Sequence, residues 1–133
     1  MGSLYESQPY QAATLSTLAG WLARTSDDAT RWRLVAEFLE EYRHEPVETR
    51  CELLAHEPPS AGDERWDVFV AALAEHLAAI DHHAAPAWSD DRRLGSFWFP
   101  FDTRAARVDA IVHAPAAFRR RGVFLAPQEL DVA

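Results

Sequence analysis

The strongest pattern of apolar positions in the chain predicts a long α-helix over residues 63–82. Its apolar side chains recur at spacings of three and four residues, which places them on one face of a helix. We expect this helix to pack at the centre of the protein and to bury that face. The repeat consists of Trp66, Phe69, Val70, Leu73, Leu77 and Ile80, and the first five of these are the expected core residues.

Three shorter patterns of the same kind predict helices earlier in the chain. Asp27 and Asp28 end a polar turn and suit the N-cap of the second helix, while Pro46 suits the start of the third. Residues 58–62 predict a sharp corner before the long helix. The three helices and their expected inward residues are 12–24 with Leu15, Leu18, Ala19 and Leu22; 28–42 with Trp32, Leu34, Val35, Phe38, Leu39 and Tyr42; and 46–56 with Val47, Cys51 and Leu54.

The chain beyond residue 82 has shorter patterns and an aromatic run. Residues 96–101 suggest an extended segment, but no other part of the chain offers a partner strand of any length. Asp102 or Thr103 can cap a helix that ends near His113, and Pro115 begins a last short helix through Arg121 that Gly122 ends. The residues expected to face inward from the first of these helices are Val108, Ile111 and Val112.

These patterns together predict an all-α fold. We expect a single domain over residues 1–133 with five or six helices and an irregular, aromatic-rich segment near residues 84–101. The first ten residues are expected to be frayed. Residues 11–82 form an acidic helical body in this interpretation, and residues 83–133 form a basic, aromatic C-terminal part.

Charge divides the chain in the same way. Residues 1–91 hold 17 acidic residues and 6 arginines, a net charge of −11, whereas residues 92–133 hold 4 acidic residues and 7 arginines, a net charge of +3. The chain has no lysine, so all 13 basic residues are arginine. An acidic helical body joined to a basic, aromatic end is more typical of a binding protein than of an enzyme.

Residues that carry catalytic or metal chemistry form no recognisable motif. Cys51 occupies an apolar helix position and is expected in the core, and the five glycines form no phosphate-binding loop. His76, His82 and His83 lack the i, i+4 spacing of a helical zinc site. We therefore expect no enzymatic activity, no metal and no cofactor. The single cysteine and the lack of a long apolar segment favour a cytoplasmic protein that does not enter a membrane.

The candidate partner-binding residues lie in the C-terminal part, because buried aromatic and arginine side chains dominate protein interfaces. They are Phe97, Trp98, Phe99, Arg119, Arg120 and Arg121. Two other interpretations stay open: the aromatic run folds back over the helices, and the arginines complement the end of a helix. The first two helices also have the lengths of a helix-turn-helix, but Glu37, Glu40 and Glu41 would repel phosphates, so direct nucleic-acid binding is not favoured.

Four segments within residues 30–130 resemble a group of small actinobacterial proteins. These segments are residues 58–67 (PPSAGDERWD), 71–78 (AALAEHLA), 97–99 (FWF) and 114–124 (APAAFRRRGVF). Some members of the group look like the antitoxins of toxin–antitoxin pairs, encoded beside nucleotidyltransferase-like or other toxins. The resemblance implies a protein that binds and neutralises a cognate toxin by occluding its active site, with a homodimer left open.

Two alternatives accompany this expectation. Many proteins of the group carry a DNA-binding helix-turn-helix domain in front, which makes a transcriptional regulator acting through the N-terminal helices the first alternative. The second is a small ligand-binding protein that uses the cluster of Arg119, Arg120 and Arg121.

Overall fold

The computed structural model describes residues 11–131, and the segment expected to be frayed, residues 1–10, lies outside them. The described residues form six α-helices and two short 3-10 helices, with no β-sheet, so the predicted all-α fold is confirmed. The elements are α2 (Leu15–Ala23), α3 (Asp28–Arg43), α4 (Val47–Ala55), α5 (Glu64–Ile80), η1 (Ala87–Ser89), α6 (Arg104–His113), α7 (Ala116–Arg119) and η2 (Pro127–Leu130).

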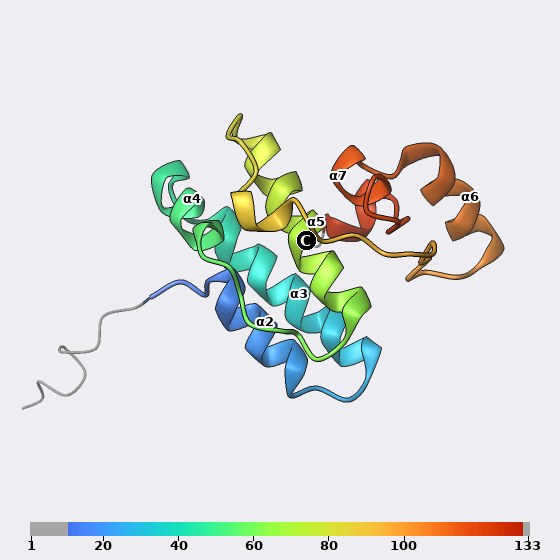
Figure 1. Ribbon diagram of the computed structural model, residues 1–133, viewed down its shortest axis with the longest axis horizontal. Coiled ribbons are helices and arrows are strands. Elements are labelled where there is room, and N and C mark those ends of the chain that lie inside the picture. The colour runs from blue at the N-terminus through green and yellow to red at the C-terminus, as the bar shows by residue number, and fades with distance from the viewer. Residues whose placement is uncertain (1–10, 132–133) are drawn as a thin grey trace, which may run out of the picture.

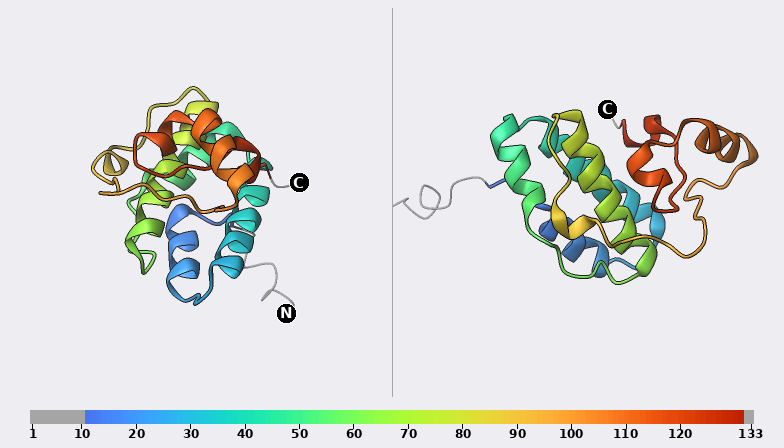
Figure 2. Two further views of the ribbon diagram at one scale, coloured as in Figure 1. Left: turned by 90° about the vertical axis from the view of Figure 1, so that its right-hand side faces the viewer. Right: turned by 45° about the horizontal axis from the view of Figure 1, so that its top comes forward.

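Helix α5 lies at the centre of the fold, as its apolar pattern predicts (Figure 1). Helix α2 packs against α3 and α5, while α7 and η1 pack against α5. Trp66, Phe69, Val70 and Leu73 are completely buried. Ile80, the last residue of the apolar repeat, is 60% exposed. The two views of Figure 2 show the other elements gathered around α5.

Helices α2 and α3 keep the faces that the sequence predicts. Leu15, Leu18, Ala19 and Leu22 are buried on α2, and Val35, Phe38, Leu39 and Tyr42 are buried on α3. Their N-termini are capped by side chains: Thr14 accepts a hydrogen bond from the Thr17 amide, and Asp27 accepts one from the Thr30 amide at 2.9 Å. Thr103, rather than Asp102, caps α6.

Helix α4 is rotated relative to the prediction. Its buried residues are Leu53 and Leu54, whereas Val47 is 39% exposed and Cys51 is exposed to solvent. The expectation that Cys51 lies in the core is therefore wrong. A nine-residue helix with so few apolar positions has no strongly defined face, and the pair of adjacent leucines decides which side meets the core.

The aromatic segment pairs with no strand among the described residues, as the sequence predicts, but a single backbone pairing holds it. Trp98 and Val123 form an isolated parallel β-bridge, in which the Trp98 amide donates to the Gly122 carbonyl at 2.8 Å and the Phe124 amide donates to the Trp98 carbonyl at 2.9 Å. Gly122 makes this pairing possible because its φ of +87° is unfavourable for other residues, and an added Cβ would lie 3.3 Å from Leu94 Cβ.

Helix α6 turns its apolar face outward, so the predicted orientation is wrong. Val108, Ile111 and Val112 are 57%, 52% and 61% exposed, respectively. The inward side instead presents Ala110 and Ala114, which pack in a small second core with Phe99 and Phe124. Small inward residues let the helix approach these two rings closely, and the larger β-branched side chains are left in solvent.

The central position of α5 leads to a first prediction. Leu73→Ala should lower the free energy of unfolding by about 2–5 kcal/mol, because it leaves a cavity in a fully buried region. Ile80→Ala on the same helix should cost less than about 1 kcal/mol, because Ile80 is largely exposed. Urea unfolding followed by far-ultraviolet circular dichroism measures both, and equal losses would contradict the assigned core.

Candidate partner-binding surface

The aromatic run alternates between the core and the surface. Trp98 points inward, where its ring meets the edge of Trp66 at a centroid distance of 5.4 Å. Phe97 and Phe99 lie on the other side, and both contact the ring of Phe124, at 5.0 Å and 5.3 Å. Phe97 is 74% exposed, whereas Trp98 and Phe99 are half-buried. Of the three predicted aromatic contacts, Phe97 alone offers most of its ring to solvent.

The cluster of Arg119, Arg120 and Arg121 does not form one basic surface. Arg121 is buried, and its guanidinium contacts the Glu75 carboxylate while donating to the carbonyls of Ala117 at 2.9 Å and Ser89 at 3.0 Å. Arg120 Nε donates to the same carboxylate at 3.0 Å. Two of the three arginines are thus already paired within the chain, which leaves little capacity to bind an external anion.

Arg119 differs from its two neighbours. It is exposed, lies over the Phe124 ring at 5.6 Å, and donates to the Ile111 carbonyl in the last turn of α6 at 2.9 Å. This hydrogen bond satisfies one of the carbonyls that a helix leaves free at its C-terminus. Arg119 therefore ties α7 to α6 and keeps a positive charge at the border of the α6 surface.

Glu75 is a functional residue that the sequence analysis did not single out. It is the only charged residue between Asp67 and Asp81 on α5, and that isolation within an apolar stretch is the signal that could have identified it. Burial raises the pKa of its carboxyl group, but hydrogen bonds from Arg121 and Arg120 outweigh this effect and hold the pKa below its ordinary value. Glu75 is therefore ionised at neutral pH and binds the C-terminal part to α5.

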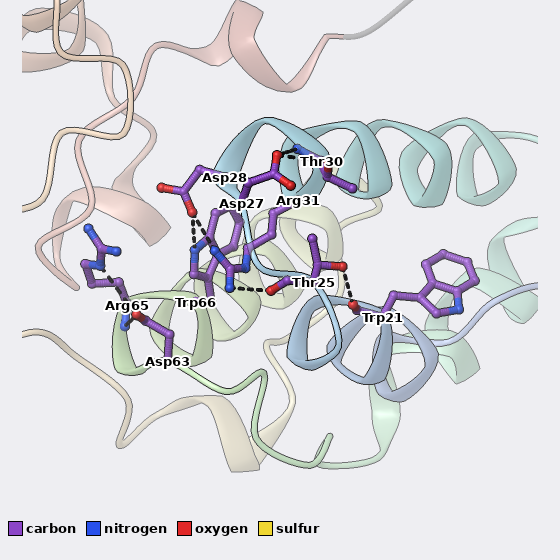
Figure 3. A network of polar contacts seen from close by, with 9 residues as sticks. All are labelled: Trp21, Thr25, Asp27, Asp28, Thr30, Arg31, Asp63, Arg65 and Trp66. Atoms are coloured by element: carbon purple, nitrogen blue, oxygen red, sulfur yellow. Dashed lines mark hydrogen bonds and ion pairs between the residues drawn. The ribbon is translucent and has the colours of Figure 1, made fainter.

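The turn between α2 and α3 is held by a network around Trp66 (Figure 3). The Trp66 indole donates to Asp28 Oδ1 at 3.3 Å, and Arg31 Nη1 donates to the same oxygen at 2.8 Å. Arg31 also donates to the Thr25 carbonyl, and the Thr25 hydroxyl donates to the Trp21 carbonyl at 2.7 Å.

This network bears on the helix-turn-helix hypothesis. Arg31 is engaged within the turn, whereas Glu37 and Glu40 are exposed further along α3. Carboxylates on the solvent side of a recognition helix would weaken binding to phosphates. Beyond the turn, the exposed side of α3 thus carries these two carboxylates together with Arg33.

Among the described residues, neither the histidines nor the groove beside Tyr42 assembles a recognisable reactive site. His76 packs on Phe118 at 5.6 Å, and burial lowers its pKa. Within residues 11–131 no three histidine, cysteine or acidic side chains are placed to bind a metal. The groove beside Tyr42 has a volume of about 540 Å³, and its Arg50 and Asp81 side chains pair with each other at 2.7 and 2.9 Å.

The outward side of α6 is the most apolar exposed surface in the described part of the chain. We call Arg104, Val108, Ile111 and Val112 the outer face of α6; they recur at spacings of four, three and one residues, and all four are exposed. Arg104 begins this face, and Arg107 lies beside it on the same helix. Arg104 makes no hydrogen bond or ion pair with any residue among 11–131, and Arg107 lies over the Phe99 ring at 4.2 Å.

A second distinctive surface lies on α3 and α4. Glu37, Glu48 and Glu52 are exposed there and form no ion pair with a described residue. Figure 1 shows that α4 and α6 lie at opposite ends of the long axis of the molecule. The protein therefore carries exposed carboxylates without ion-pair partners on α3 and α4, and an apolar surface bordered by arginines on α6, at the end opposite α4.

Comparisons of the chain with known proteins identify no relative. No protein family, no characterised protein and no solved structure matches it. Among residues 11–131, no helix is both long enough and apolar enough to span a membrane.

The ion pairs of Glu75 lead to a second prediction. Glu75→Ala should lower the free energy of unfolding at pH 7 by about 3–5 kcal/mol, because it leaves the buried charge of Arg121 without a partner. Arg120→Ala is the control and should cost less than about 1 kcal/mol, because that side chain is largely exposed. Guanidinium unfolding measures both variants; equal, small losses would contradict a structural role for Glu75.

The direction of the pKa shift adds a pH dependence to this test. Because the pKa of Glu75 is lowered in the folded protein, the stabilisation is complete above its ordinary value near 4.5 and disappears as the pH falls through the folded-state pKa. The stability difference between the wild-type chain and Glu75→Gln should therefore narrow below pH 4.5. A difference that stays constant from pH 7 to pH 3 would overturn this assignment.

The alternation of the aromatic run leads to a third prediction. Trp98→Ala should lower the free energy of unfolding by about 3 kcal/mol, because it removes the ring that packs on Trp66. Phe97→Ala should change stability by less than about 1 kcal/mol. Thermal unfolding distinguishes the two, and an unchanged melting temperature for Trp98→Ala would show that the bridge does not hold Trp98 in the core.

Proposed function

We propose that this chain is a non-enzymatic, antitoxin-like protein that binds a cognate toxin and neutralises it by covering its active site. The observation that carries the proposal is the separation of two exposed surfaces, one acidic and one apolar with arginines, at opposite ends of one small fold. Such a molecule can attract a partner through one surface and hold it through another. The resemblance of four segments to antitoxin-like proteins supports the same function.

The acidic surface fits the expected mode of inhibition. A toxin that acts on nucleotides or nucleic acids binds phosphates in a basic cleft, and carboxylates can take the place of those phosphates. Glu37, Glu48 and Glu52 provide three such carboxylates on neighbouring helices, and none is neutralised by a described arginine. We propose that this surface covers the cleft, and that the protein acts in the cytoplasm, where a single free cysteine stays reduced.

Expression of the chain together with the protein encoded beside it tests the proposal. The two proteins should co-purify as a stable complex, and the chain should restore growth to cells in which the neighbouring protein is toxic. The matched control is a chain that carries Leu73→Asp, which removes the fold and should abolish both effects. A neighbour that is harmless, or that remains toxic despite normal expression of the chain, would overturn the proposed function.

A fourth prediction concerns the association rate. Replacing Glu37, Glu48 and Glu52 by glutamine should slow association with the toxin about 10-fold at low salt, because it removes long-range attraction, and should change dissociation little. Higher ionic strength should slow association of the wild-type chain in the same way. Surface plasmon resonance at several salt concentrations measures both rates.

The matched control removes three negative charges from another part of the surface. Glu64, Asp90 and Asp91 are also exposed, so their replacement by glutamine or asparagine changes the net charge by the same amount. This control should slow association clearly less than the first triple variant. Equal rates for the two variants would show that net charge alone, rather than the surface on α3 and α4, attracts the partner.

A further inference from the structure

We propose that the outer face of α6 is the high-affinity docking site, and that it inserts into an apolar groove bordered by carboxylates on the partner protein. This inference rests on the proposed function for the identity of the partner, because the partner is taken to be the cognate toxin. It assigns the binding contacts to Arg104, Val108, Ile111 and Val112, a set different from the aromatic and arginine residues that the sequence suggests.

Neither helix propensity nor burial in the core explains why α6 carries valine and isoleucine on its outward side. Valine and isoleucine are poorer helix formers than alanine, arginine or glutamate, so they do not favour an exposed helix. Their side chains contribute little to the core, because all three are more than half exposed. Full burial of each against a partner is worth about 1.5–3 kcal/mol. The gain from these residues is therefore realised only when another surface covers them.

The contacts beneath α6 hold the helix in an orientation that keeps its outer face exposed. Ala110 and Ala114 sit against Phe99 and Phe124, Arg107 lies over Phe99, and Arg119 holds the Ile111 carbonyl. In Figure 1 the helix projects from the end of the molecule, away from α2, α3 and α4. A projecting convex helix with apolar residues at spacings of three and four is the element that binds in the groove of another protein.

A second copy of the chain is a poor occupant of this surface. Helix α6 has ten residues, so its face is about 15 Å long and about 10 Å wide, far below the roughly 800 Å² per partner of a stable interface. An antiparallel pair of such helices would also bring Arg104 of one copy towards Arg119 of the other. A concave partner solves both problems, because its walls contact the flanks of the helix and its rim can supply carboxylates.

Charge identifies the chemistry of that rim. The Arg104 side chain has no partner among the described residues, Arg107 is half-exposed and pairs with Asp102 at 2.6 Å, and Arg119 is exposed at the other end of the face. The one carboxylate on α6 itself, Asp109, is occupied by His113 at 2.8 Å and by Gln128. The three arginines at the borders of the face outnumber the two carboxylates beside it, Asp102 and Asp109, so the net charge there is positive and matches acidic residues around an apolar groove.

The test measures binding of the full-length chain to the toxin encoded beside it. Ile111→Asp should weaken the complex about 30-fold or more, mainly through faster dissociation, because it places a charge at the centre of the buried contact. Ile80→Asp is the matched control, since Ile80 is exposed to a similar extent but lies on α5 and outside the outer face of α6, and it should leave affinity unchanged. Arg104→Glu should slow association several-fold at low salt.

Three outcomes decide between the possibilities. If the wild-type chain binds the toxin and Ile111→Asp binds equally well, the docking site lies elsewhere and the proposed function stands. If the wild-type chain forms no complex, both the function and this inference fail. If sedimentation shows a dimer of the wild-type chain that Ile111→Asp dissociates, the face joins two copies, and the heterologous partner is overturned.

Hydrogen exchange provides a measurement that needs no variant. The amides of α6 should exchange more slowly in the complex than in the free chain, whereas those of α2 should not change. Unchanged exchange throughout α6 in a saturated complex would overturn the inference.

Discussion

The buried ion pair between Glu75 and Arg121 determines how the C-terminal part of this protein meets its central helix. Taking two charges out of water costs several kcal/mol for each ion, and the cost is offset only when the groups also find well-placed hydrogen bonds. Arg121 meets this condition through the carbonyls of Ala117 and Ser89, which belong to α7 and η1. One guanidinium therefore joins α7 and η1 to a single carboxylate on α5.

The remaining features of the C-terminal part follow from this anchor. Gly122 comes directly after Arg121, and its positive φ turns the chain so that Val123 pairs with Trp98. The pairing places Trp98 in the aromatic core and leaves Phe124 on the other side, where it supports Phe97, Phe99 and α6. We interpret the ion pair as a device that fixes geometry, because a mispositioned Arg121 would leave its own buried charge without a partner.

Sequence patterns could predict most of the fold but little of the partner surface. The repeated apolar positions of α5 define its buried face, and Asp27 and Thr103 cap helices as their residue types suggest. The same reasoning fails at α6, because periodicity shows that Val108, Ile111 and Val112 share a face but not whether that face meets the core or a partner. Likewise, an arginine triplet does not reveal that two of its members bind a glutamate about 45 residues earlier.

The inward alanines of α6 explain why its apolar face can remain outward. Burying an alanine contributes less free energy than burying a valine or isoleucine, so a helix that served stability alone would present its larger residues to the core. Here the rings of Phe99 and Phe124 occupy the available space, and only small residues fit between them and the helix backbone. The arrangement leaves α6 less strongly held than α5 and leaves its largest apolar side chains in water. Any protein that covers these side chains stabilises the folded helix as it binds, because it binds the folded and not the unfolded segment. A partner that docks on α6 as proposed would therefore couple its binding to the local folding of this helix.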